Sequence, residues 1–146
     1  MEQLNLPPAD LKLINDNGLV KVLDPYRKKY VKLTPEEYVR QSFLSFLTNN
    51  LSYPLALTAV EHLVEINGLK QRADIVIYDR SFRPYLIVEC KATSVPITQE
   101  VFAQALRYNT RLGVKYLIVT NGLKHYCAEI ADGKAIFLKE VPVWKD

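Results

Sequence analysis

The segment from Arg72 to Lys91 constrains the fold most strongly, because it reads as a β-hairpin that is apolar on both faces. The runs ADIVIYD and PYLIVEC are rich in β-branched and aromatic residues, and the polar stretch RSFR separates them. Such runs predict strands at about 72–79 and 84–91 joined by a short turn. We therefore expect other elements to cover the hairpin on both sides.

Three charged residues interrupt this hairpin at one end. With Asp79 opposite Pro84 across the turn, Asp74 faces Glu89, and Lys91 lies on the same face as Glu89. Two carboxylates directly opposite each other repel, so we expect a cation between them. A hard ion such as Mg²⁺ would bind one oxygen of each acid, together with a backbone carbonyl and water. A salt bridge among the three residues is the alternative interpretation.

Length and composition indicate one domain. A chain of 146 residues with 49% hydrophobic and 24% charged residues can form one core, and its net charge of +3 permits a polyanionic partner. Cys90 and Cys127 form no metal-ligand motif or disulfide framework, and no apolar run is long enough to span a membrane. We therefore expect a cytoplasmic domain without a membrane partner, with residues 1–18 as a loosely attached lead-in containing a short helix and residues 19–146 as the core.

A capped helix is predicted over residues 35–50. Thr34 precedes a proline and two glutamates, which supplies an N-cap and an acid three residues after it. On a helical wheel Glu36 falls beside the apolar stripe, whereas Glu37 falls away from it and is accounted for by the capping box. Glu36 is therefore a candidate site residue, and an ion pair with Arg40 one turn later is an equal alternative.

Two segments flank this helix. Residues 19–33 predict a small hairpin or edge strands with clustered basic side chains, which either protect an edge from aggregation or contact phosphates. The run TAVEHLVEI predicts a strand that ends at Asn67-Gly68, a strong signal for a two-residue hairpin turn. Such a turn would place Glu61 beside Asp74 as a third acid, whereas a longer turn would not.

A second helix is predicted over residues 99–112, with Thr98 as its N-cap and Gly113 after its end. Three polar residues border its apolar stripe: Gln104, Tyr108 and Arg111. They either reach the acids at the sheet edge or form the rim of a packed helix. The run KYLIVTN follows, and its helical crossover predicts a strand parallel to the strand of Glu89.

The order of these elements is a helix, three antiparallel strands, a helix and a further strand. Asp74 on the second strand and Glu89-Cys90-Lys91 at the end of the third resemble the active-site motif of the PD-(D/E)XK nuclease superfamily, without the usual proline before the aspartate. The resemblance implies an α/β, restriction-endonuclease-like fold with a mixed central sheet, an αβββαβ core and flanking helices.

Further segments narrow the resemblance. Gln104 to Tyr108 is similar to the Gln-x-x-x-Tyr motif of the RecB-like branch. Over about residues 20–130, the chain resembles the N-terminal nuclease domain of type I restriction enzyme R subunits in five segments: TPEEYVRQSF, RADIVIYD, IVECKA, QALRYN and VTNGLKHY. Those subunits continue into an ATP-driven motor. This sequence has no G-x-x-x-x-G-K-[ST] loop, so DNA translocation does not carry over.

The resemblance implies a Mg²⁺-dependent endonuclease that hydrolyses phosphodiester bonds in DNA, as in restriction-modification. Asp74, Glu89 and the Cys90 carbonyl would hold the Mg²⁺, for which Mn²⁺ could substitute. Lys91 would orient the attacking water, and Glu36 would be a further ligand or base. The residues expected to position the DNA backbone are Gln104, Tyr108 and Arg111.

Two other functions fit the same residues. A nucleic-acid-binding or assembly module would keep the fold without cleaving, and a protein-interaction domain would use the acids only in salt bridges. The expected partner is DNA. The sequence leaves open whether two copies pair, whether a separately encoded motor or specificity subunit binds, and whether Glu36, Glu37 or Glu61 supplies a third acid.

Overall fold

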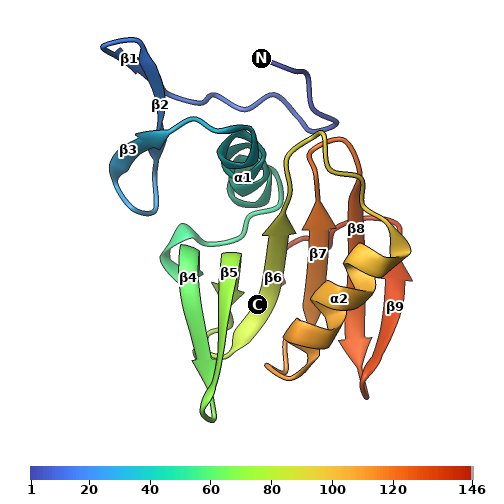
Figure 1. Ribbon diagram of the computed structural model, residues 1–146. Coiled ribbons are helices and arrows are strands. Elements are labelled where there is room, and N and C mark those ends of the chain that lie inside the picture. The colour runs from blue at the N-terminus through green and yellow to red at the C-terminus, as the bar shows by residue number, and fades with distance from the viewer. Residues whose placement is uncertain (146) are drawn as a thin grey trace.

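The computed structural model describes residues 1–145, which form a mixed α/β structure with two helices and two sheets (Figure 1). The helices are α1 (Pro35–Ser45), which continues as a π-helical turn over Phe46–Asn50, and α2 (Gln99–Thr110). The small antiparallel sheet contains β1 (Leu13–Asp16), β2 (Leu19–Asp24) and β3 (Lys29–Lys32). No helix among residues 1–145 is long and apolar enough to cross a membrane.

The large sheet has six strands in sequence order: β4 (Thr58–Ile66), β5 (Leu69–Tyr78), β6 (Pro84–Cys90), β7 (Tyr116–Thr120), β8 (His125–Ala131) and β9 (Lys134–Leu138). All neighbours are antiparallel except β6 and β7, which are parallel and joined through α2. The helices predicted over residues 35–50 and 99–112, the three-stranded meander and the parallel crossover are confirmed, with ends shifted by a few residues.

Both faces of the large sheet are covered, as the apolar hairpin predicts. On one face Val39 and Phe43 of α1 belong to the same buried cluster as Ile75 of β5. On the other face Phe102 of α2 belongs to a second cluster, which includes Val76 from the same strand. Residues next to each other on β5 thus face opposite layers, which explains why the hairpin sequence is apolar without alternation.

The register of β5 and β6 agrees with the prediction over Ile75–Ile77, where Ile75 pairs with Val88 and Ile77 with Leu86. Near the turn the prediction is wrong: a bulge pairs Tyr78 with Pro84, not with Tyr85. The alternation of apolar residues fixes the middle of a strand, whereas a bulge depends on how the turn closes.

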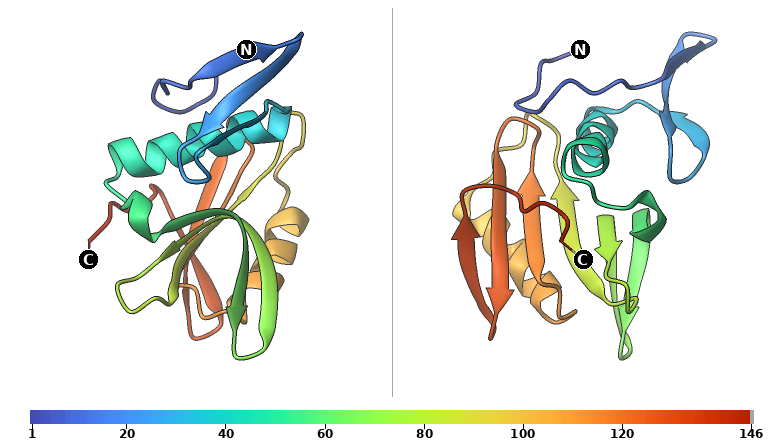
Figure 2. Two further views of the ribbon diagram at one scale, coloured as in Figure 1. Left: turned by 90° about the vertical axis from the view of Figure 1, so that its left-hand side faces the viewer. Right: turned by 180° about the vertical axis from the view of Figure 1, so that it is seen from behind.

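Strands β4 and β5 also pair in the register that the Asn67-Gly68 turn predicts. The pairing is interrupted only at Glu61 and Asp74, between the pairs Val60↔Ile75 and His62↔Ala73. Glu61 has a φ of +52°, a left-handed conformation that costs a non-glycine residue about 1–3 kcal/mol. The hairpin bends over below α1 (Figure 2, left).

The N-terminal residues are not a loose lead-in with a short helix. The Asn5 N–H donates to the Gly122 carbonyl at 2.9 Å, and His125 Nε2 lies 2.7 Å from the Asn5 carbonyl oxygen. The side chain of Leu4 covers Gly122 so closely that a Cβ there would lie 2.9 Å from it. Asn17-Gly18 forms the turn of the β1–β2 hairpin.

Candidate functional site

The ionisable side chains proposed for the site gather at one end of the large sheet, where α1 begins, β4 and β5 bend, and β6 ends (Figure 1). We call this group the charged rim and define it by seven residues: Glu36, Glu37, Arg40, Glu61, Asp74, Glu89 and Lys91. The registers of the two hairpins bring Glu61, Asp74 and Glu89 to the same level of the sheet, and α1 supplies Glu36, Glu37 and Arg40.

Arg40 is the cation at the centre of the charged rim. Its Nη2 lies 2.7 Å from Glu61 Oε1 and 3.2 Å from both Asp74 Oδ1 and Glu36 Oε1. Its Nη1 donates to the carboxylate of Glu37. Burial alone lowers the pKa of Arg40, but the carboxylates of Glu37, Asp74 and Glu61 raise it above its ordinary value. The Arg40 side chain is only 6% exposed, so its charged group is largely shielded from water, whereas the Glu36 side chain is 49% exposed.

Asp74 lies beside β6, just beyond the last backbone pair of the two strands. The Cys90 N–H donates to Asp74 Oδ2 at 2.7 Å, while Oδ1 accepts from Arg40. The carboxylate therefore continues the hydrogen bonding between β5 and β6 where the backbone ladder stops. The predicted placement of Asp74 against the end of β6 is correct.

Glu89 and Lys91 complete this end of β6. Lys91 Nζ lies 3.7 Å from Glu89 Oε1, and both side chains are about one-third exposed (35% and 36%). Burial and the nearby charge of Asp74 raise the pKa of Glu89, and Lys91 opposes this shift. Asp74, Glu89 and Lys91 thus interact electrostatically, as the hairpin register predicts.

The prediction that Glu36 points inward and Glu37 outward is wrong. Glu37 is buried and accepts from Gln41 Nε2 at 3.0 Å, whereas the side chain of Glu36 is 49% exposed. The N-cap is confirmed, since the Glu37 N–H donates to Thr34 Oγ1 at 3.0 Å, but no return bond from Thr34 to the Glu37 carboxylate forms. The alternative ion pair between Glu36 and Arg40 is confirmed.

The helical wheel fails because α1 is covered on two sides. The small sheet lies over α1 on the side away from the large sheet (Figure 2, left). Asp24, at the end of β2, is fully buried and holds Arg27 Nε at 2.6 Å, and Arg27 Nη2 reaches Glu37 at 3.4 Å. This role of Arg27 is not predicted from the sequence, where its only signal is a basic side chain between the segments that form β2 and β3.

The polar line on α2 does not reach the charged rim. Gln104, Tyr108 and Arg111 are exposed, and none of them makes a hydrogen bond or ion pair with a rim residue among residues 1–145. Cys90 is different, because its thiol is buried in the α1-side core and burial raises its pKa well above the ordinary value. Only the backbone of Cys90 is therefore available to the site.

Comparison with known proteins identifies the family. The family model described as type I restriction enzyme R protein N terminus (HSDR_N) matches residues 35–142, a segment that contains the whole charged rim. The chain belongs to this family. No curated protein matches it.

A solved structure shares the fold of this family member. It is described as the fragment structure of a putative HsdR subunit of a type I restriction enzyme from Vibrio vulnificus YJ016. The two chains are 21% identical with a TM-score of 0.55, and the match covers 76% of this chain and 24% of the other. This R protein N-terminal domain thus spans about a quarter of the solved relative.

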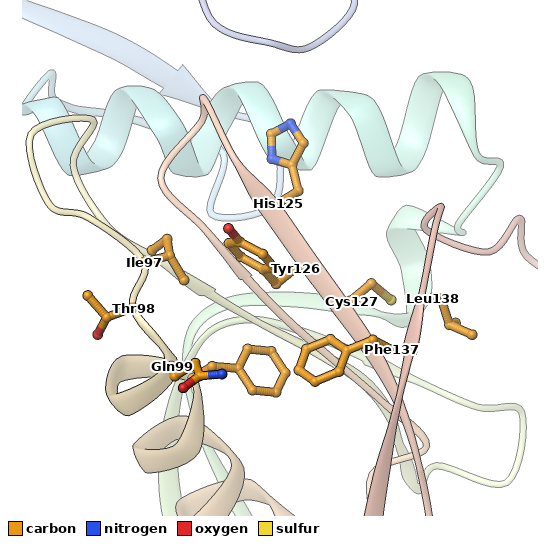
Figure 3. Close-up of a pocket in the computed structure, with 9 residues that line it drawn as sticks. Ile97, Thr98, Gln99, His125, Tyr126, Cys127, Phe137 and Leu138 are labelled. Atoms are coloured by element: carbon orange, nitrogen blue, oxygen red, sulfur yellow. The ribbon is translucent and has the colours of Figure 1, made fainter.

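No group of three His, Cys, Asp or Glu side chains within residues 1–145 is arranged to hold a metal ion. The domain also has an apolar pocket of about 380 Å³ between the start of α2 and strands β8 and β9 (Figure 3). Tyr126 and Phe137 line it, and it shares no residue with the charged rim. This lining offers no pair of acids for phosphodiester chemistry, so the charged rim is the candidate active site.

Proposed function

We propose that the domain is a metal-dependent DNA endonuclease with a restriction-endonuclease-like αβββαβ core. The observation that carries this proposal is the placement of Asp74, Glu89 and Lys91 at one end of two paired strands. Membership of the R protein N-terminal family supports it, because the matching model is named for part of a restriction enzyme. DNA cleavage is accordingly the reaction class for which these residues are best suited.

The residues fit a hard divalent cation. Asp74, Glu89 and the Cys90 carbonyl would hold Mg²⁺ or Mn²⁺, because carboxylate and carbonyl oxygens are the ligands that these ions prefer. The register that brings the two carboxylates to the same level, and the raised pKa of Glu89 beside Asp74, support a need for positive charge there. A bound ion would neutralise the phosphate and lower the pKa of its water.

The protein's own residues supply the remaining roles. Lys91, partly exposed beside Glu89, would orient the attacking water or hold a phosphate oxygen. The exposed carboxylate of Glu36 would serve as a proton acceptor at the mouth of the site. The exposed residues of α2 proposed to contact the DNA backbone are Gln104, Tyr108 and Arg111.

Partner binding is part of the proposal. The exposed Lys28, Lys29 and Lys32 around β3 make no ion pair with any of residues 1–145, so they are available to phosphates. Contacts of this kind confer no sequence preference. Since the solved relative is described as a subunit, we further propose that the domain works with a second copy or with separately encoded motor or specificity subunits.

A second candidate function is a nucleic-acid-binding or assembly module that does not cleave. It is favoured by one specific observation: both oxygens of Asp74 already accept hydrogen bonds, one from Arg40 and one from the Cys90 N–H. Each carboxylate oxygen has a further lone pair, so these bonds do not exclude a metal ligand role.

A plasmid-nicking assay distinguishes the two functions. We expect the wild type to nick supercoiled DNA with Mg²⁺ or Mn²⁺, and Asp74→Asn and Lys91→Ala to lose about 100-fold or more of this activity. Lys134→Ala, an exposed lysine on β9, is the matched control and should retain full activity. DNA binding without nicking would favour the assembly module, and equal nicking by all four proteins would point to a contaminating nuclease.

A further inference from the structure

We infer that Arg40 is a built-in second cation of the site, so that the charged rim takes one divalent ion, at Asp74 and Glu89, and not two. The inference rests on the proposed metal-dependent function and deepens it. Nuclease sites with two metal ions neutralise their acids with both ions. Here Arg40 would neutralise the acids on the α1 side, and the metal ion only those on the β6 side.

The first argument is the number of oxygens around one nitrogen. Arg40 Nη2 carries two hydrogens, but carboxylate oxygens of Glu36, Glu61 and Asp74 all lie within 3.2 Å of it. These acids come from α1, β4 and β5. Several carboxylates from different elements converging on one point form the kind of oxygen shell that a hard cation takes. The guanidinium nitrogen occupies the centre of that shell.

The second argument is that Arg40 is fixed in this position. Its side chain is 6% exposed, and its Nη1 is held by Glu37. Glu37 is itself held by Gln41 and Arg27, and Arg27 by the fully buried Asp24. Arg40 is thus linked to the β2–β3 turn of the small sheet through a chain of ion pairs.

The third argument comes from the backbone of β4. Glu61 adopts a left-handed φ of +52° at the one break in the β4–β5 pairing, and its carboxylate lies 2.7 Å from Arg40 Nη2. A strained conformation at such a place is typical of a functional constraint. Glu61 is therefore directed to the arginine, and the carboxylates left for a metal ion are Asp74 and Glu89.

The fourth argument is electrostatic. A second divalent ion bound by Glu36, Glu61 and Asp74 would lie in contact with the guanidinium, where two positive charges repel strongly in a partly buried site. Removing the charge of Arg40 would leave Glu36 and Glu61 without a counter-ion and Asp74 with only the first metal ion. A second divalent ion would then become the natural replacement.

Counting bound Mn²⁺ by electron paramagnetic resonance tests the inference without measuring cleavage. We expect one ion per chain in the wild type and two in Arg40→Gln. Arg27→Gln is the matched control: it also removes a guanidinium charge next to Glu37, but Gln41 still holds Glu37 and Arg40 keeps its rim carboxylates, so this variant should still bind one ion. Circular dichroism establishes that each variant is folded.

Glu61→Gln supplies a second test that keeps Arg40 and its charge. Because we infer that Glu61 pairs with Arg40 and does not bind the metal ion, this variant should bind one Mn²⁺ with the wild-type affinity. Two ions in the wild type, one ion in folded Arg40→Gln, or loss of the ion in Glu61→Gln would each overturn the inference alone. A wild type that binds no Mn²⁺ would overturn the proposed function and the inference with it.

Discussion

The middle of strands β5 and β6 and the charged rim at their ends are built on different principles, although they share the same two strands. In the middle, Ile75–Ile77 pairs in regular register, and its three side chains are fully buried. At the charged rim the backbone pairing stops and the φ angle of Glu61 is left-handed. Four carboxylates surround Arg40 there. Stability comes from the regular region, whereas the irregular region holds charges that a fold without a function would avoid.

The largest expected effect on stability lies in the middle of the sheet. Ile77→Ala should lower the free energy of unfolding by about 2–5 kcal/mol, because it leaves a cavity at a fully buried position. Ile77→Val, the matched control, should cost about 0.5–1.5 kcal/mol. Urea denaturation measures both values. A cost below about 1 kcal/mol for the alanine variant would contradict the assignment of stability to this region.

A smaller effect is expected where β4 bends. Glu61→Asn and Glu61→Gln both remove the ion pair with Arg40, but asparagine tolerates a left-handed φ better. We therefore expect the asparagine variant to be more stable than the glutamine variant by about 1 kcal/mol in urea denaturation.

The matched position for that comparison is Glu65, which lies further along β4 in a regular pair with Lys70. There the order should reverse, because asparagine is less favourable in an ordinary strand. The same order at both positions would mean that the backbone at Glu61 is not strained.

The smallest expected effect concerns pH. Burial lowers the pKa of His125 below its ordinary value of 6.5, while a bond to the Asn5 carbonyl opposes the shift. The folded state therefore binds fewer protons than the unfolded state just below pH 6.5, so the stability from neutral His125 is present above that pH and is lost as the pH falls.

Chemical denaturation at pH 7.5 and pH 5 measures this loss. His125→Gln should lose less stability than the wild type between the two values. His125 lies at the rim end of β8 but bonds to Thr120 and Asn5, not to a rim acid. An unchanged pH dependence in the variant would contradict the assignment of this loss to His125.

The elements could be predicted from the sequence because their signals are local. Thr34 and Thr98 cap the two helices, and the Asn67-Gly68 turn sets the register that places Glu61 beside Asp74. The family resemblance is confirmed by the model that matches residues 35–142. Local signals were therefore sufficient for the two helices, the order of strands β4 to β7 and the grouping of the acids.

The cation among the acids could not be predicted in the same way. The orientation of Glu37 depends on Arg27 and Asp24, which belong to a sheet that packs on the far side of α1. A helical wheel drawn for one covered face cannot show that. The only sequence signal for Arg40 was its spacing of four residues from Glu36. That spacing predicts the ion pair with Glu36, but not those with Glu37, Glu61 and Asp74.

The docked N-terminal segment has a practical consequence for recombinant work. Thr93 Oγ1 donates to the Glu2 carboxylate at 2.6 Å, and Tyr38 donates to the Glu2 carbonyl at 2.7 Å. An affinity tag placed before Met1 would begin next to this contact, and Thr93 follows Lys91 by two positions in the chain. A polyhistidine tag there would bring its own metal ligands to the mouth of the site, so protein for Mn²⁺ counting should carry no tag at this end.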